Sequence, residues 1–307
     1  MYQHITLLLA CWSLVACSTS AQKEAQTFYD YQLFSPNAAL VSLTNLPQEL
    51  IDADVILVGE WHTHAGIHHF QTDLLKSLYK NRKIALSMEQ FSRNTQSHLD
   101  QYLDGEIGEQ TLIKEADAWP NYESDYRPLV EFAKAHQLDI IAANAPKHIV
   151  RCIGRQGIDY LDKLSPNQRA MVATKVNTQA SPYKEKFMAS MHHGASEQAE
   201  RYYAAQVTWD ETMAESITQY LETHPKTQVV HIAGTFHVEQ GLGIKSSILT
   251  RQPRLNVVVV TPNGEIMSNS QDYQLKVLSP PTRYVKEENR LKEYQQLSKR
   301  NDDLTCL

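Results

Sequence analysis

Short apolar runs alternate with stretches of helical periodicity through most of this chain. Five runs have the length of buried strands: residues 55–58, 83–88, 138–143, 229–234 and 255–260. Between them, apolar residues recur every three or four positions, which predicts helices at residues 66–80, 92–103, 106–116, 125–136 and 197–221. Strands that alternate with helices favour an α/β fold, with a mostly parallel central sheet flanked by helices.

The segment between the third and fourth strands, residues 146–222, is long enough for an insertion. We expect it to be mostly helical and to lie over the strand ends as a lid, although residues 151–196 look polar and irregular. Residues 271–278 have the pattern of an edge strand. Residues 31–285 would then form the folded domain, and residues 286–307 a strongly charged, solvated tail.

Polar side chains follow four of the predicted strands. They are Glu60, His62 and His64 after the first strand, Glu89 after the second, Asn144 after the third and His237 after the fourth. The first and fourth strands end in the same pattern, Gly-x-x-His, in which the glycine permits a sharp turn. Because the turns after parallel strands emerge at one edge of a sheet, we expect these side chains to converge on one crevice.

Carboxylates and imidazoles in one crevice suit two kinds of chemistry. They suit a divalent metal such as zinc or manganese. They also suit acid–base chemistry without a metal, in which one carboxylate is kept protonated by its partner. The alternative is a polar network that ties helix N-termini to the sheet, and for Glu89 and Asn144 taken singly it is equally plausible.

The N-terminus predicts export. Residues 5–17 are apolar and carry no acidic side chain, a run too short to span a bilayer but typical of a signal peptide. Leu14-Val15-Ala16-Cys17 resembles a bacterial lipobox, so residues 1–16 would be removed and Cys17 would carry the lipids. Residues 17–30 would form a small, polar tether, and Ser18 favours the outer membrane. The net charge of −6 and the absence of a basic stripe in the sequence argue against nucleic acid as a partner.

Two cysteines remain in the exported chain, Cys152 and Cys306. An even pair in an exported protein permits a disulfide, which would clip the C-terminal tail onto the domain. Two free thiols are equally plausible from the sequence.

Candidate haem ligands gather in the insertion and just before the third strand. They are His192, His193, Tyr126, Tyr183, Tyr202 and Tyr203. The histidine pair lies near Met188 and Met191, and such a cluster can hold haem or copper, although it is more often a solvated pair beside core methionines. A tyrosinate can ligate ferric haem, but most tyrosines on a helical stripe pack in a core.

Five segments together resemble a known family. They are Gly-Glu-Trp-His at 59–62, Ser-Met-Glu-Gln-Phe at 87–91, Ala-Ala-Asn-Ala-Pro at 142–146, Ala-Gln at 205–206 with Asp-Glu-Thr-Met-Ala at 210–214, and Gly-Thr-Phe-His at 234–237. The chain is similar, from about residue 43 to residue 260, to the ChaN-like haem-binding lipoproteins. Their wider superfamily includes TIKI-type metallopeptidases, TraB-like proteins and erythromycin esterases.

The resemblance implies an α/β domain with a helical lid, tethered to the bacterial outer membrane. It implies haem binding in iron acquisition, with the haem held between the subunits of a homodimer and passed on to a haem transport system. The implied iron ligand is a tyrosine, and a histidine of the other subunit contacts a propionate. The hydrolytic branches of the superfamily imply instead that Glu60, His62, Glu89 and His237 bind a divalent metal, as in a metal-dependent peptidase or esterase.

Helix geometry ranks the tyrosines. Tyr202 and Tyr203 point about a hundred degrees apart on a helix, so at most one of them faces a haem slot. Tyr202 falls on the apolar stripe and is expected in the core, which makes Tyr203 the better candidate ligand and Tyr126 a rival. On the basis of the family resemblance, we predict a haem-binding protein rather than an enzyme. The alternatives are the metal-dependent hydrolase and a structural or partner-binding lipoprotein that keeps an inherited pocket. All these tyrosines could also pack in the core, with no haem bound among them.

Overall fold

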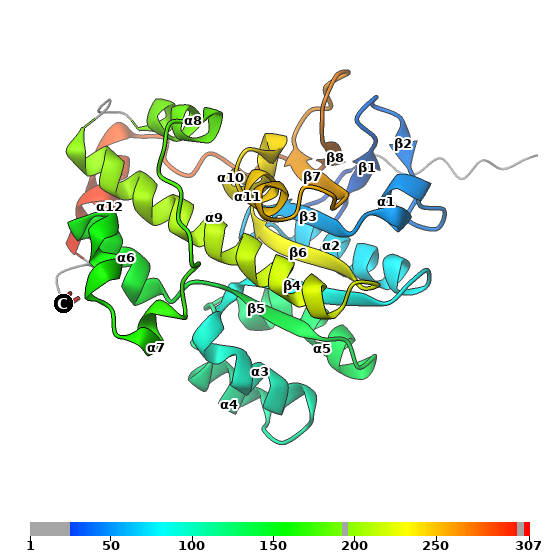
Figure 1. Ribbon diagram of the computed structural model, residues 1–307. Coiled ribbons are helices and arrows are strands. Elements are labelled where there is room, and N and C mark those ends of the chain that lie inside the picture. The colour runs from blue at the N-terminus through cyan, green and yellow to red at the C-terminus, as the bar shows by residue number, and fades with distance from the viewer. Residues whose placement is uncertain (1–24, 192–195, 300–303) are drawn as a thin grey trace, which may run out of the picture.

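The computed structural model describes residues 25–191, 196–299 and 304–307, and within them an eight-stranded sheet lies between two layers of helices (Figure 1). The strand order is β2-β1-β8-β7-β3-β6-β4-β5. The strands are β1 (Gln32–Phe34), β2 (Leu40–Val41), β3 (Val55–Glu60), β4 (Ile84–Ser92), β5 (Ile140–Asn144), β6 (Gln228–Gly234), β7 (Val257–Asn263) and β8 (Tyr273–Lys276). The six strands from β8 to β5 are parallel, which confirms the predicted fold class. Among the strands of the described residues, the antiparallel pairings are those of β1 with β2 and with β8.

Helices cover both faces of the sheet. They are α1 (Gln48–Asp52), α2 (Ala65–Tyr79), α3 (Gln96–Leu103), α4 (Glu109–Glu115), α5 (Arg127–Ala135), α6 (Lys147–Gln156), α7 (Pro166–Arg169), α8 (Pro182–Ser190), α9 (Glu197–Thr223), α10 (Thr235–Val238), α11 (Ile244–Arg251) and α12 (Glu287–Lys299). In Figure 1, α9 and α11 lie in front of the sheet and α2 lies behind it. No helix in the described part of the chain combines the length and the apolar composition needed to cross a membrane.

Strand β3 is a continuous apolar run in the sequence because both of its faces are buried. Successive side chains of a strand point to opposite faces. Val55 and Leu57 pack with the core under α9 and α11, whereas Ile56 and Val58 pack with the core under α2 and α5. All four are fully buried, and burial of each such side chain stabilises the fold by about 1.5–3 kcal/mol. A parallel strand covered on both faces therefore has no polar side to show in the sequence.

The insertion is helical, as predicted, but more regular than its sequence suggested. The stretch 151–196 was expected to be polar and irregular, yet it contains the end of α6 and all of α7 and α8. Ser165 and Ser181 cap the latter two helices through their side-chain oxygens, which accept hydrogen bonds from backbone N–H groups. The two halves of helix α9 have different packing partners. The first half packs on α6 and α8, and the second half packs on the sheet.

The predicted edge strand is not at an edge. Strand β8 lies between β7 and β1, because β1 and β2 extend the sheet beyond it. Those two strands have three and two residues, too few to show any periodicity in the sequence. The edges of the sheet are β2 and β5.

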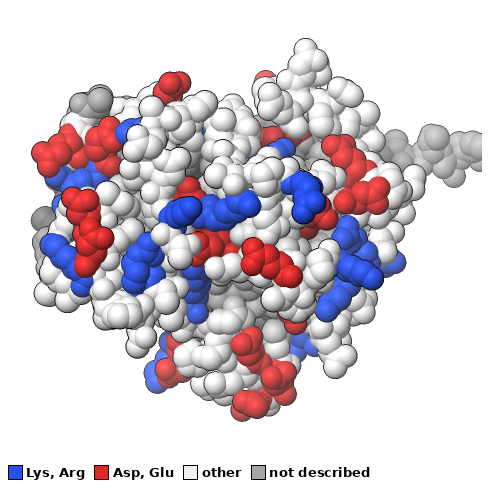
Figure 2. Space-filling model, in the orientation of Figure 1, with Lys and Arg blue, Asp and Glu red and all other residues white. Residues whose placement is uncertain are grey.

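A disulfide joins Cys152 to Cys306 and settles a question that the sequence left open. It holds the last residues against α6, where the Gln156 side chain also donates a hydrogen bond to the carbonyl oxygen of Leu307 at 3.2 Å. The charged tail is thus tied back to the domain at its end. On the face seen in Figure 2, lysine and arginine side chains are interspersed with aspartate and glutamate.

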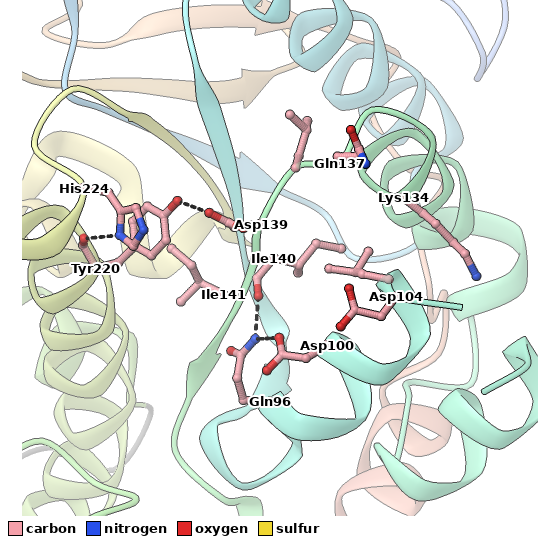
Figure 3. A pocket seen from close by; sticks show the side chains of 12 residues that line it. Gln96, Asp100, Asp104, Lys134, Gln137, Asp139, Ile140, Ile141, Tyr220 and His224 are labelled. Atoms are coloured by element: carbon pink, nitrogen blue, oxygen red, sulfur yellow. Dashed lines mark hydrogen bonds between the residues drawn. The ribbon is translucent and has the colours of Figure 1, made fainter. Parts of the chain in front are cut away.

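A side-chain amide covers the exposed edge of β5. Gln96 Nε2 donates to the carbonyl oxygen of Ile140 at 2.7 Å, and Gln96 Oε1 accepts from the backbone N–H of Ala142 at 2.7 Å. Asp100 holds the same amide through a hydrogen bond of 2.9 Å (Figure 3). The amide therefore occupies the two backbone positions that a further strand would take, which protects the edge from pairing with another chain.

Replacement of this amide tests its role. Gln96→Ala removes two hydrogen bonds to buried backbone, so we expect the free energy of unfolding in urea to fall by about 1–2 kcal/mol. We also expect more self-association in sedimentation velocity, because the edge becomes available. Gln101→Ala, on the same helix, is the control and should change neither property; equal effects of the two changes would contradict the assigned role.

Candidate functional site

The crevice lies where the carboxyl ends of β3 and β6 meet. These strands are neighbours and parallel, and their chains leave in opposite directions. After β3 the chain enters α2 on one face of the sheet, and after β6 it enters α10 and α11 toward the other. Adjacent strands with such divergent connections open a crevice at the sheet edge, the usual place for a ligand in this class of fold.

Glu60 is the centre of the first half of the site. Its side chain is 2% exposed and accepts hydrogen bonds from His62 Nδ1 at 2.9 Å and from the Tyr126 hydroxyl at 2.6 Å. The Nε2 amides of Gln71 and Gln90 complete the shell, at 2.8 and 3.1 Å. Burial alone would raise the pKa of Glu60. The hydrogen bonds and the charge of a nearby imidazole outweigh it and hold the pKa below its usual value, so the carboxylate stays ionised.

His237 is the centre of the second half. Its Nδ1 donates to Asp210 Oδ1 at 2.6 Å, and its Nε2 lies 3.7 Å from Glu89 Oε1. Burial lowers the pKa of an imidazole, but the charges of Asp210 and Glu89 prevail over it and over Lys186, and raise the pKa of His237 to about 9. The imidazole is therefore a cation at neutral pH.

The two halves meet at Gly234. A Cβ atom there would lie 2.9 Å from His62 Cε1 and 3.5 Å from His237 Cδ2, so only glycine allows both rings to approach. Glu89 fixes the same residue by accepting its backbone N–H at 2.7 Å. The expected convergence of Glu60, His62, Glu89 and His237 is confirmed by this geometry.

Two cavities of about 760 Å³ each flank the imidazole pair, and His62 and His237 line both. The pKa of His62 is also raised: burial opposes protonation, but Glu60 and Glu89 favour it more than the charge of His237 disfavours it. The arrangement can hold protons and donate them into either cavity. Among the described residues, no group of three or more His, Cys, Asp or Glu side chains is arranged so that it could hold a metal ion.

Two further candidates at the strand ends have structural partners. His64 Nε2 donates to the carbonyl oxygen of Leu278 at 2.8 Å, and its ring lies against Trp61, so it joins the start of α2 to the segment after β8. Asn144 donates to the carbonyl oxygen of Glu89 at 3.0 Å and joins the ends of β5 and β4. This contact joins two strand ends and not a helix N-terminus to the sheet, and Asn144 also lines one of the two cavities.

The tyrosine candidates divide by exposure, and the expectation that Tyr202 lies in the core is wrong. Tyr203 is 1% exposed and packs against Tyr183 and Phe187, whereas Tyr202, expected in the core, is 46% exposed. Tyr126 and Tyr183 are buried as well. The buried face of α9 differs between its two halves, because the first half packs on α8 and not on the sheet. His192, His193 and Cys17 lie outside the described residues.

An open groove of about 640 Å³ surrounds Tyr202 between α6, α8 and α9. Apolar side chains form its walls, among them Phe187, Met191 and Trp209. Two cationic side chains, Arg151 and Arg155, line it from α6. The groove thus combines a phenol, flat apolar walls and positive charge.

Sequence reasoning missed several residues of the crevice. Asp210 was quoted only as part of a motif, and its buried partner lies far along the chain. Gln206 lies one turn before Asp210 and within 3.0 Å of the same imidazole nitrogen. The signal was present as helical spacing, because Tyr202, Gln206 and Asp210 follow one another at four-residue intervals on α9. Gln71 and Gln90 carried no such signal.

Comparison with known proteins identifies a family for most of the chain. Residues 46–248 match the family described as "Haem-binding uptake, Tiki superfamily, ChaN". A curated relative, the chloroplastic Protein RETICULATA-RELATED 5 of Arabidopsis thaliana, is 23% identical over 240 residues. That match covers 71% of this chain, and the chain spans 32% of the relative's length.

Solved structures resemble the fold. A structure of ChaN from Campylobacter jejuni, which concerns cofacial haem binding, superposes with a TM-score of 0.64 at 19% identity. The match covers 81% of this chain and 98% of that one. An erythromycin esterase in its open conformation gives a TM-score of 0.45 at 10% identity, with 86% and 87% of the two chains covered.

The charge of Asp210 should control the titration of His237. In Asp210→Asn we expect the pKa of His237 to fall from about 9 by about 1–2 units, because an adjacent opposite charge is lost. Histidine NMR titration measures it, with Asp100→Asn as the control. A pKa of His237 unchanged by the substitution would contradict the assigned cause.

The same shift makes stability depend on pH. A raised pKa in the folded state contributes stability that is complete below the unfolded value of about 6.5 and is lost as the pH rises through about 9. Urea titrations of the wild-type protein should therefore show this loss between those pH values, and Asp210→Asn should show a smaller one.

Proposed function

The chain belongs to the ChaN family of haem-binding uptake proteins in the Tiki superfamily, and we propose from this that it binds haem for iron acquisition through Tyr202. The observation that carries the proposal is the exposure of Tyr202 at the groove between α6 and α9. A ferric haem needs an axial ligand, and a tyrosine oxygen is a known one. Among the four candidate tyrosines, Tyr202 alone is open to solvent.

The groove suits the rest of a haem molecule. Phe187, Met191 and Trp209 offer apolar contacts to a porphyrin face. Arg151 and Arg155 lie on α6 at the same groove and are of the right charge for the propionates. Gly154 lies between them, where a Cβ would be in ordinary van der Waals contact, 3.8 Å, with the Tyr202 ring.

The three buried tyrosines suit ligation poorly. A tyrosinate must lose its proton, and burial together with nearby carboxylates raises the pKa of Tyr126 and Tyr183 far above 10. The pKa of Tyr203 is raised as well, chiefly by burial. Ligation by any of them would also require the surrounding core to open.

We extend the proposal to the assembly and its location. The groove is open to solvent, so a second copy of the chain could cover a haem held at Tyr202. We therefore propose a homodimer with haem at its interface. We also propose that Cys17, at the end of the lipobox-like segment, carries lipids that tether the domain to the outer membrane, and that haem passes from there to a transport system.

Haemin titration tests the ligand. Tyr202→Phe should abolish the charge-transfer band of tyrosinate-ligated ferric haem and weaken binding at least about tenfold, because the iron loses its anionic ligand. Tyr203→Phe and Tyr183→Phe are the matched controls, each removing one phenol oxygen from the same region, and should keep the spectrum.

The outcomes separate the ligand from the fold. Loss of the band in Tyr203→Phe or Tyr183→Phe, with Tyr202→Phe unaffected, would transfer the role to the buried tyrosine. Wild-type spectra in all three variants would remove tyrosine ligation from this segment. Circular dichroism of each variant excludes misfolding as the cause.

Metabolic labelling tests the tether. Cells that express the wild-type protein should incorporate a labelled fatty acid into it, and Cys17→Ser should abolish the label, because the serine cannot be processed as a lipobox cysteine. Cys152 and Cys306 are not candidates for the label, since they form the disulfide. Equal labelling of both forms would refute lipidation at Cys17.

A further inference from the structure

An aromatic turn begins the described part of the chain. Asp30 Oδ2 accepts hydrogen bonds from the backbone N–H groups of Gln26 and Thr27 at 3.0 and 2.7 Å, and from the Thr27 hydroxyl at 2.9 Å. The tight turn that results presents two large rings to solvent: Phe28 is 44% exposed and Tyr29 is 70% exposed. Rings of this size are seldom left in water at such exposure without a function when they are neighbours.

The turn is fixed to the domain from below. The carbonyl oxygens of Phe28 and Asp30 lie so close to Gly66 that a Cβ there would be within 2.9 Å of both. The His69 ring donates to the carbonyl oxygen of Tyr29 at 3.2 Å. The two aromatic rings are therefore held in place at the start of α2.

A second segment completes a rim around the flanking cavity of the crevice. His64 holds the carbonyl of Leu278, and the chain then runs through Pro280 and Pro281 to Arg283, all exposed. We define the rim as Phe28, Tyr29, Pro280, Pro281 and Arg283, which line one cavity of about 760 Å³. The rim is apolar and aromatic, with one cation.

We propose that this rim lies on the lipid surface to which the protein is tethered. The inference rests on the lipid anchor proposed for Cys17. Phe28 lies eleven positions after Cys17 in the sequence. Even a fully extended chain of that length keeps the aromatic turn within about 40 Å of the lipids on Cys17.

The chemistry of the rim fits an interface between headgroups and acyl chains. The tyrosine ring suits that depth because its apolar body leaves water while its hydroxyl stays wet, and the phenylalanine ring adds apolar area beside it. Arg283 can pair with the phosphate of an anionic lipid. The anchor supplies attachment, and the rim sets the orientation, with the cavity behind it opening toward the lipid.

The test uses the full-length lipidated protein in vesicles of phosphatidylethanolamine and phosphatidylglycerol, with or without bromine on the acyl chains. Tyr29→Trp places a fluorophore at the rim. Tyr79→Trp is the matched control, because Tyr79 is 41% exposed. It is the last residue of α2 and lies about 21 Å from the start of that helix, where the rim is located. Wild-type emission, which comes from the native tryptophans, is subtracted from both.

We expect the added emission of Tyr29→Trp to be quenched at least about threefold more strongly than that of Tyr79→Trp. Replacement of Phe28 and Arg283 by serine in the Tyr29→Trp background should lower this quenching. Equal quenching of the two tryptophans in protein that floats with the vesicles would overturn the proposal. A blue-shifted but unquenched tryptophan at position 29 would assign the rim to a protein contact and overturn it as well. Failure of the wild-type protein to float would refute the anchor itself, a separate result.

Discussion

A buried carboxylate at the end of the central strand governs the architecture of the crevice. An ionised group removed from water costs several kcal/mol unless hydrogen bonds replace its hydration. Glu60 meets this requirement with donors from its own turn, from α2, from β4 and from the turn before α5: His62, Gln71, Gln90 and Tyr126. Four segments must therefore converge on Glu60, because their donors replace the water molecules that an exposed carboxylate would bind.

The two Gly-x-x-His motifs depend on each other in the same way. A Cβ at Gly234 would collide with His62 of the first motif. A Cβ at Gly59 would lie 3.3 Å from Thr235 Cα, in the second motif, and 2.9 Å from Val238 Cγ2, just after it. Each glycine thus makes room for the other motif. The repeated Gly-x-x-His pattern reflects two turns that pack against one another. The two copies together therefore indicate a shared site, which a single copy does not.

Much of the fold and part of the site could be predicted from the sequence, and the limits have physical causes. The buried strands and the convergence of Glu60 with His237 followed from apolar runs and parallel topology. Strands β1 and β2 are too short to show a period. Tyr202 was misplaced because one apolar stripe was assumed along a helix whose neighbours change halfway. Asp210 was missed because its hydrogen-bond partner His237 is 27 residues away, and its helical spacing from Gln206 does not by itself indicate a buried acid.

Helix α9 physically links the crevice to the groove. Tyr202 and Asp210 lie on the same side of it, eight residues and therefore about 12 Å apart. Asp210 is held by His237 at the sheet edge, and the neighbouring acid Glu211 is paired with Arg251 of α11. These contacts are buried and charged, so they resist sliding or rotation of the helix. The groove around Tyr202 is therefore positioned by the sheet, although none of its walls belongs to a strand. The imidazole–carboxylate pair thus fixes the position of α9, and with it the groove that we propose for haem.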